Sequence, residues 1–471
     1  MTWAAAPIAL PEELARSLRR DGLTTGGLSI YVHALGGAAP LLAFAAEEPR
    51  APASVMKLLP TLAALDELGP AYKWQTELWS AAPLHDRTLA GDLYLKGSGD
   101  PYLVIEHFWR LLRRLRQAGV ATIDGDLVLD DSYFAPEPED PADFDGRSYR
   151  AYNVLPSALL LNFQAVQFRF IPDTAAQRVR IVAEPWPAQL TLENKLRLTR
   201  GACSGWWVGN VGMRFVQREQ REVVAFNGSY DAACGERDFF RVVTEPVGYV
   251  YGVFRSLWTE MGGQLRGGVR RATVPPEARL LASIESPPLA DTIRSVNKYS
   301  NNVMTRQLLL TLGAVHGGAP GTTQKGIAAV RAWMEKRGLD ATGVVLENSA
   351  GLSRHERISA RQLGTLLLTA FASPVMPEFL SSLPVTGLDG TMRHRFAASP
   401  LTGRVHLKTG SIDDVNAIAG YVLDRFDRRV AVVVLHNHAR ADTAAGSAFQ
   451  DAVLEWVFRG SPAEALPANT R

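Results

Sequence analysis

The chain has 471 residues, of which 46% are hydrophobic and 21% are charged, and its formal net charge at pH 7 is +2. Single hydrophobic cores stop growing at about 250 to 300 residues, so this length predicts two or three domains. The balanced charge, without a dense block of Lys and Arg, argues against a nucleic-acid-binding protein, and no apolar run approaches the about 20 residues that span a bilayer.

The N-terminal part begins with residues 1–10, which lack the basic and apolar regions of an export signal, so a signal is either absent or already removed. Residues 27–33 and 41–45 predict two strands of an antiparallel hairpin, because a Gly- and Pro-containing turn joins two apolar runs. A helix is predicted over residues 53–68, where it stops at Gly69 and Pro70.

The middle of the chain changes to short β-type runs separated by polar turns, and it predicts a β-rich insertion. These runs lie at 166–171, 178–183, 206–211 and 222–227. Helical periodicity then returns at 289–312, 326–337 and 359–372, and strands at 404–409, 416–423 and 429–436 precede a last helix over 443–458.

This order of elements predicts an α/β (α+β) domain formed by both ends of the chain, residues 1–83 and 275–471. Residues 84–274 form the inserted region. We expect this region to contain two subdomains, one of residues 84–164 with 246–274 and a β-rich one of residues 165–245.

The two cysteines, Cys203 and Cys234, have no C-x-x-C spacing that would suggest zinc binding or redox chemistry. We expect them to form one disulfide in an oxidising compartment. The alternative is a pair of buried free thiols.

Ser54 and Lys57 stand three residues apart on the predicted helix, so a hydroxyl and an amine share one face. Serine is a weak nucleophile that needs a base, and lysine becomes one only when burial or a second cation lowers its pKa. An S-x-x-K also arises by chance, as Ser295 and Lys298 illustrate. Pro60 should kink the helix close to this pair.

Lys408, Thr409 and Gly410 end a predicted strand, and this tripeptide is much less frequent by chance than S-x-x-K. A lysine here can hold a substrate carboxylate and lower the pKa of Lys57, while the Thr409 hydroxyl adds a hydrogen bond. The alternative is an ordinary strand end.

Ser300 and Asn302 form an S-x-N at the start of a predicted helix. Ser300 can relay a proton between Lys57 and the leaving group, and the Asn302 amide can orient a substrate backbone. A helix-capping serine followed by solvated amides is the simpler interpretation. Spacing alone does not distinguish this S-x-N from Ser295 and Asn297.

S-x-x-K, S-x-N and K-T-G in this order are the motifs of the penicillin-interacting serine acyltransferases. Specifically, the chain resembles the class C low-molecular-mass penicillin-binding proteins, the D-alanyl-D-alanine carboxypeptidase/endopeptidase family. The resemblance covers nearly the whole chain, including the insertion between Lys57 and Ser300. It rests on residues 52–59 (PASVMKLL), 91–101 (GDLYLKGSGDP), 300–302 (SNN), 383–385 (LPV), 387–392 (GLDGTM) and 408–411 (KTGS).

The resemblance implies a β-lactamase/transpeptidase-like fold and a periplasmic enzyme that cleaves peptidoglycan stem peptides and cross-links through a Ser54 acyl-enzyme. Ser54, Lys57 and Ser300 are then catalytic, Asn302, Lys408 and Thr409 bind substrate, and the backbone N–H groups of Ser54 and Ser411 form the oxyanion hole. β-Lactam antibiotics are the expected inhibitors, and no cofactor is expected.

Two other functions are compatible with these residues. A β-lactamase shares the nucleophile but hydrolyses its acyl-enzyme faster, and a non-catalytic peptidoglycan-binding homologue keeps the fold. No metal is expected, since H-E-x-x-H is missing and His436 with His438 is interpreted as a surface pair. The lack of G-x-S-x-G argues against an α/β-hydrolase.

Overall fold

The computed structural model describes residues 9–218 and 221–460, so most of the N-terminal segment considered above for an export signal lies outside it. The chain forms two compact units. The first consists of Met1–Lys73, Ala135–Glu137 and Pro287–Arg471, and the second of Trp74–Phe134 and Pro138–Ser286. The second unit thus starts before and ends after the predicted insertion, because strands β3 and β17 at its two ends pair with each other.

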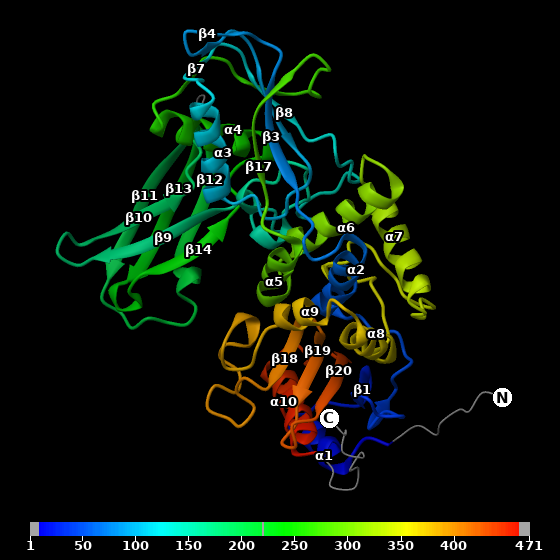
Figure 1. Cartoon of the computed structure of the whole chain (residues 1–471). Helices are drawn as coiled ribbons and strands as arrows, with labels where there is room; N and C mark the ends of the chain where they lie inside the picture. The colour runs from blue at the N-terminus through cyan, green and yellow to red at the C-terminus, as the bar shows by residue number, and fades with distance from the viewer. Residues whose placement is uncertain (1–8, 219–220, 461–471) are drawn as a thin grey trace. The chain divides into compact units, whose positions relative to one another are not determined.

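The first unit is built on a five-stranded antiparallel sheet of order β18-β19-β20-β1-β2 (Figure 1). Its N-terminal hairpin and three C-terminal strands are those predicted from the sequence. The strands are β1 (Leu28–Ala34), β2 (Leu42–Phe44), β18 (Val405–Ile412), β19 (Val415–Leu423) and β20 (Arg429–Asn437).

Helices cover both faces of this sheet, which explains why every residue of β1 is buried. On one face, α1 (Glu12–Arg20) and α10 (Ala444–Arg459) contribute to a core with Leu28, Ile30 and Val32 of β1. On the other face, α8 (Ala360–Ala372) packs against β1 and β20.

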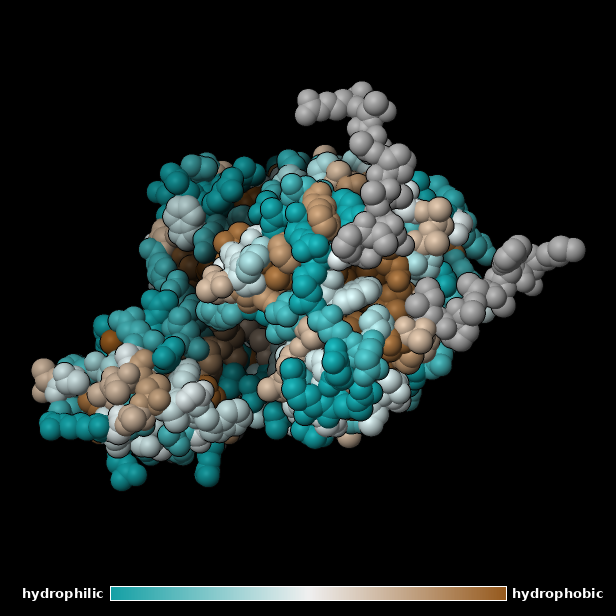
Figure 2. Space-filling view, turned by 90° about the horizontal axis from the view of Figure 1, so that it is seen from below, coloured by the Kyte–Doolittle hydropathy of each residue, from teal (hydrophilic) through white to brown (hydrophobic). Residues whose placement is uncertain are grey.

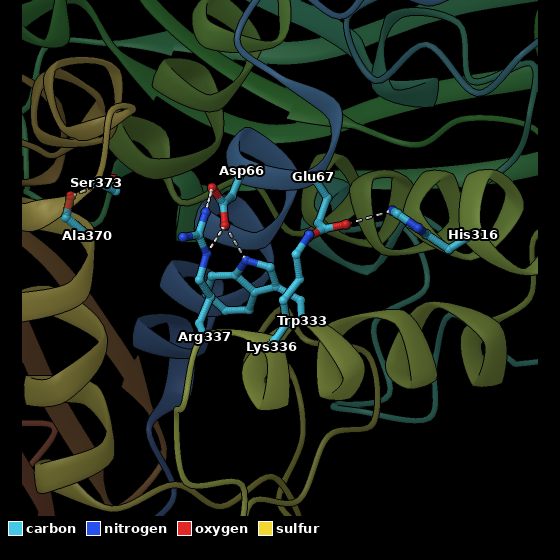
Figure 3. Close-up of polar contacts among 8 residues, drawn as sticks. All are labelled: Asp66, Glu67, His316, Trp333, Lys336, Arg337, Ala370 and Ser373. Carbon is cyan, nitrogen blue, oxygen red and sulfur yellow. Dashed lines mark hydrogen bonds and ion pairs between the residues drawn. The ribbon is translucent and has the colours of Figure 1, made fainter.

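A helical layer continues the first unit around the short η1 (Ala53–Lys57) and α2 (Leu58–Leu68), which packs against α5, α6, α7 and α9. These helices are α5 (Leu289–Tyr299), α6 (Asn302–Gly317), α7 (Thr323–Lys336) and α9 (Met376–Ser382). Ion pairs and hydrogen bonds fix the C-terminal end of α2: Asp66 binds Trp333 of α7 and Arg337, which follows α7, and Glu67 binds Lys336 (Figure 3).

Two helices that the sequence predicted as continuous are interrupted in the structure. Residues 53–57 form a 3-10 helix, and the α-helix begins at Leu58, so Pro60 lies in its first turn, where a backbone N–H has no helical partner in any case. The predicted helix over 289–312 is broken at Ser300, whose φ of 57° ends α5, and the Asn301 side chain caps α6.

The second unit contains three sheets and two helices (Figure 1). A five-stranded sheet has the order β16-β8-β6-β3-β17, and a four-stranded one the order β15-β7-β5-β4. Their strands are β3 (Gln75–Ser80), β4 (Leu84–His85), β5 (Thr88–Leu89), β6 (Leu93–Gly97), β7 (Thr122–Ile123), β8 (Leu127–Asp130), β15 (Gln264–Leu265), β16 (Val269–Arg271) and β17 (Arg279–Glu285), and the helices are α3 (Ile105–Gln117) and α4 (Pro246–Glu260).

The third sheet has six strands in the order β12-β13-β11-β10-β9-β14. They are β9 (Val166–Asp173), β10 (Arg178–Glu184), β11 (Leu190–Thr199), β12 (Val211–Arg218), β13 (Arg221–Asp231) and β14 (Arg237–Arg241). The strand predicted over 206–211 is instead mostly a 3-10 helix, Trp207–Asn210, which precedes β12. A disulfide joins Cys203 and Cys234.

The surface is mainly polar on the face shown in Figure 2, where hydrophobic residues appear in smaller patches among hydrophilic ones. No helix within residues 9–218 and 221–460 is both long and apolar enough to cross a membrane.

Candidate active site

The S-x-x-K pair lies on η1 in the first unit. In a 3-10 helix, side chains at positions i and i+3 lie directly above one another. The Lys57 Nζ atom is accordingly 2.8 Å from Ser54 Oγ. Ala53, which precedes the serine, has a φ of 44°, an unfavourable backbone conformation that occurs mainly where the surrounding structure enforces it.

Lys57 is completely buried and contacts three oxygen atoms. Besides Ser54 Oγ, its Nζ atom lies 2.7 Å from Asn302 Oδ1 of α6 and donates to the backbone carbonyl of Ala350. Burial lowers the pKa of Lys57 to about 7, although the negative charge of Glu356 acts to raise it. An amine that is partly in its free form at neutral pH therefore lies against the serine hydroxyl.

The K-T-G lysine lies next to the S-x-N serine. Lys408 Nζ is 2.8 Å from Ser300 Oγ and 2.6 Å from the Thr409 carbonyl oxygen, and the lysine is completely buried. Burial, followed by the proximity of Lys57, lowers the pKa of Lys408 well below its ordinary value. Lys57 thus acts to lower the pKa of Lys408, whereas the expected effect of Lys408 on Lys57 is not among the causes of the lowered pKa of Lys57, which is due to burial.

The outer edge of β18 carries the remaining predicted residues. The Leu407 N–H and the Val405 carbonyl bind the segment at 384–386, outside the sheet. Because N–H groups alternate in direction along a strand, those of Thr409 and Ser411 point to the same outer side. Ser411 is exposed, and Thr409 Oγ1 lies 2.9 Å from Thr391 Oγ1.

Two glycines allow neighbouring segments to lie close to Ser54. A Cβ atom on Gly410 would lie 2.8 Å from the Ser54 backbone nitrogen, and one on Gly351 would overlap the carbonyl oxygen of Ala53. Gly351 also has a φ of 74°, which favours glycine. The backbone of Ser54 is therefore held between β18 and the turn at 347–351.

The residues of the second S-x-x-K and the second S-x-N have different contacts. Lys298 of the second S-x-x-K binds Asp389 Oδ2 at 2.6 Å and the Leu383 carbonyl, and Asn297 Nδ2 lies 2.9 Å from Ser382 Oγ. Ser300 and Asn302, rather than Ser295 and Asn297, therefore contact the two buried lysines.

Three parts of the site were missed in the sequence: the carbonyl of Ala350, the turn that carries it and the buried carboxylate of Glu356. The turn has a sequence signal, since Asn348, Ser349 and Gly351 are turn-forming residues. Glu356 has none, because nothing in a polar segment distinguishes a buried glutamate from a solvated one.

No metal site was expected from the sequence, and His436 with His438 was interpreted as a surface pair. In the described parts of the chain, no group of three or more His, Cys, Asp or Glu side chains is arranged to hold a metal ion. The interpretation of His436 as a surface residue was wrong: it is 2% exposed, its Nε2 atom lies 3.1 Å from the Thr24 carbonyl oxygen, and burial lowers its pKa to about 4.

Comparison with known proteins identifies the class of this site. A model of the D-Ala-D-Ala carboxypeptidase 3 (S13) family matches residues 10–459. The chain belongs to this family. The D-alanyl-D-alanine carboxypeptidase of Actinomadura sp. (strain R39) is 31% identical over 390 residues, which are 79% of this chain and 70% of that protein. The resemblance deduced from the motifs is confirmed, and this S13 chain is a serine-type D-Ala-D-Ala carboxypeptidase.

Two sequence or structure matches from Haemophilus influenzae are also similar to this chain, and one of them is a crystal structure. The D-alanyl-D-alanine carboxypeptidase DacB is 25% identical over 395 residues, 82% of this chain and 80% of DacB. The crystal structure of penicillin binding protein 4 from the same organism superposes with a TM-score of 0.76 at 21% identity and covers 94% of this chain and 99% of its own. The predicted fold class of this S13 protein is thereby confirmed.

Proposed function

We propose that Ser54 is the nucleophile of this carboxypeptidase and that Lys57 is the base that activates it. The observation that carries the proposal is the 2.8 Å contact between Lys57 Nζ and Ser54 Oγ, made by a completely buried lysine. A pKa of about 7 for Lys57 leaves a large fraction of free amine at neutral pH. Such a match between pKa and working pH is what an efficient general base requires.

The hydrogen bonds of Lys57 support the same role. Asn302 Oδ1 and the Ala350 carbonyl can only accept, so they take the two N–H groups of a neutral amine. The nitrogen lone pair is then directed at Ser54 Oγ and can receive the hydroxyl proton.

In the proposed cycle, Ser54 Oγ attacks the carbonyl carbon of the D-Ala-D-Ala amide as Lys57 takes its proton. The proton passes, with Ser300 as relay, to the leaving nitrogen, the C–N bond breaks and D-alanine departs. Water then attacks the acyl-enzyme ester, loses its proton to Lys57, and Ser54 is released. Each proton removed from a nucleophile is returned to a leaving atom.

Lys408 and Thr409 bind the terminal carboxylate of the substrate. Burial lowers the pKa of Lys408 in the free enzyme, but a bound carboxylate favours its ammonium form, which Ser300 holds at 2.8 Å, and the Thr409 hydroxyl supplies a further donor. Asn302 orients the substrate backbone and holds Lys57. The N–H groups of Ser54 and Ser411 stabilise the oxyanion, and each such donor contributes about a hundredfold to a thousandfold in rate.

The natural substrates in this proposal are peptidoglycan stem peptides and cross-links in the periplasm, with β-lactams as acylating inhibitors. Penicillin binding protein 4 of H. influenzae has been solved in complex with a β-lactam, which supports the inhibitor class. The expected oxidising compartment agrees with the Cys203–Cys234 disulfide.

The test is the intact mass of the protein after incubation with benzylpenicillin, for wild type and Ser54→Ala, with D-alanine release from a D-Ala-D-Ala peptide followed in parallel. We expect a stable adduct and D-alanine release for wild type only. Rapid penicillin turnover without an adduct would instead favour a β-lactamase. A folded wild type with neither adduct nor release would contradict the proposal in favour of a binding protein.

A further inference from the structure

Glu356 is a completely buried carboxylate that the proposed reaction does not use. It follows the turn that contacts Lys57, and all four of its backbone contacts come from N–H donors of that turn. Its Oε1 atom accepts from Glu347 at 3.1 Å, Asn348 at 3.1 Å and Ser349 at 2.6 Å, and its Oε2 atom accepts from Gly351 at 3.0 Å.

These contacts decide how the turn is folded. Ser349 has a φ of 56°, an unfavourable conformation for a residue with a side chain, and Gly351 has a φ of 74°. A carboxylate that binds the N–H groups on both sides of Ala350 compensates for this strain. The Ala350 carbonyl belongs to the same planar peptide unit as the Gly351 N–H, so the carboxylate that accepts from this N–H also fixes the direction in which the carbonyl accepts from Lys57 Nζ.

The same turn also touches the nucleophile's own backbone. Gly351 lies so close to Ala53 that any side chain there would overlap the Ala53 carbonyl oxygen. A displacement of the turn would therefore move the Ala350 carbonyl, which accepts from Lys57, and also the glycine that packs against the backbone next to Ser54.

We infer that Glu356 is a positioning residue of the active site, which folds the 347–351 turn against Ser54, aims the Ala350 carbonyl at Lys57 and supplies a fixed negative charge beside the lysine. This inference rests on the proposed role of Lys57 as the base. The charge of Glu356 favours the ammonium form of Lys57, so Glu356 sets the pH at which the base becomes available.

The groups that face Lys57 define this balance. Ser54 of η1, Asn302 of α6 and the Ala350 carbonyl are uncharged. Among the described residues, Glu356 is the anion that acts on the pKa of Lys57, and Lys408 of β18, whose own pKa Lys57 helps to lower, is the other titratable amine. Burial raises the pKa of Glu356 overall, although the N–H donors and Lys57 act to lower it. Because the four N–H groups that bind its two oxygens can only donate, they favour the ionised carboxylate over the neutral acid.

The experiment measures the rate of benzylpenicillin acylation between pH 5 and 9 by intact mass for wild type, Glu356→Gln and Glu356→Asp. Glutamine keeps the size and removes the charge, whereas aspartate keeps the charge and shortens the reach. Asp424→Asn is the matched control, because Asp424 is also buried and also accepts turn N–H groups, from Phe426 and Arg428, at the far end of β19.

For wild type, the rate should rise with pH through the pKa of Lys57, since only the free amine accepts the proton. In Glu356→Gln this rise should shift to lower pH by on the order of one unit, and the plateau rate should fall about ten- to a hundredfold because the turn is misplaced. Glu356→Asp should lower the plateau but keep the wild-type midpoint. Asp424→Asn should change thermal stability only.

A folded Glu356→Gln with the wild-type midpoint would overturn the inference and leave Glu356 a purely structural residue. Where the glutamine variant does not fold, Glu356→Asp decides, and a wild-type plateau rate in that variant would also overturn it. If wild type itself forms no adduct, the proposed function fails first, and this outcome is distinct from the other two.

Discussion

Two groups of buried side chains, one in each unit, are built on different principles. In the first unit, Lys57 and two ionisable groups that interact with it, Lys408 and Glu356, are all completely inaccessible to solvent. In the second unit, the six-stranded sheet buries a cluster of aromatic rings. Phe226 lies at its centre, with ring centroids 5.0 Å from Phe168 and 5.5 Å from Phe170.

This difference separates two uses of burial. Burying an aromatic ring removes apolar surface from water and stabilises the fold. Burying a lysine opposes its charge, which destabilises the fold unless partners compensate, and here the result is a base with a pKa of about 7. The buried lysines of the first unit therefore cost stability and supply chemistry, whereas the aromatic cluster of the second unit serves stability, although that unit also buries Asp100 and Arg241.

The largest effect is expected for Lys57→Ala, which removes the buried amine beside Ser54. Loss of the base should slow acylation by benzylpenicillin by about a hundredfold to ten-thousandfold and remove the dependence of the rate on a group titrating near pH 7. Acylation rates across the pH range are the measurement. Lys298→Ala, the lysine of the other S-x-x-K, is the control and should still acylate; a slow Lys298→Ala with an active Lys57→Ala would reverse the assignment.

The next effect concerns the second unit. Phe226→Ala should lower the free energy of unfolding by about 3 to 5 kcal/mol, because it leaves a cavity among packed rings. Chemical denaturation measures this change, with Phe240→Ala as the control, since Phe240 is 52% exposed. Acylation of the folded variant should keep the wild-type rate. A loss of acylation in folded Phe226→Ala would contradict this distinction between the two units. The aromatic cluster would then be needed for the reaction as well as for stability.

The smallest effects are expected at the contact between α2 and α7 (Figure 3). Burial of Asp66 opposes its ionisation, but the bonds from Arg337 and Trp333 outweigh it and lower the pKa of Asp66. Asp66→Asn should therefore cost about 1 to 3 kcal/mol in unfolding free energy. The cost of Glu67→Gln should be at most about 1 kcal/mol, because its partner Lys336 is largely exposed.

Thermal unfolding of both variants measures the difference. Equal costs would show that the two carboxylates anchor the end of α2 to the same extent. Since α2 continues directly from η1, a slower acylation in Asp66→Asn would further show that this anchor reaches the nucleophile.

The sequence was sufficient to find the three motifs because they occur together in this order, although a second S-x-x-K and a second S-x-N are also present. It was also sufficient for the strands of the first sheet, whose apolar runs are bounded by clear turns. It did not reveal the break at Ser300, since local periodicity continues across it and only the φ of 57° interrupts the helix. Nor did it reveal the burial of His436 or Glu356, because burial of a polar side chain depends on contacts between residues far apart in the chain.

The glycines at 351 and 410 have a consequence for how this enzyme can change over generations. Both lie against the main chain of Ala53 and Ser54, where a single added methyl group would collide. Substitutions of Gly351 or Gly410 that would alter the surroundings of Ser54, and so reduce acylation by β-lactams, are therefore disfavoured. Substitutions are instead expected among the side chains around the site, while the backbone at Ser54 remains unchanged.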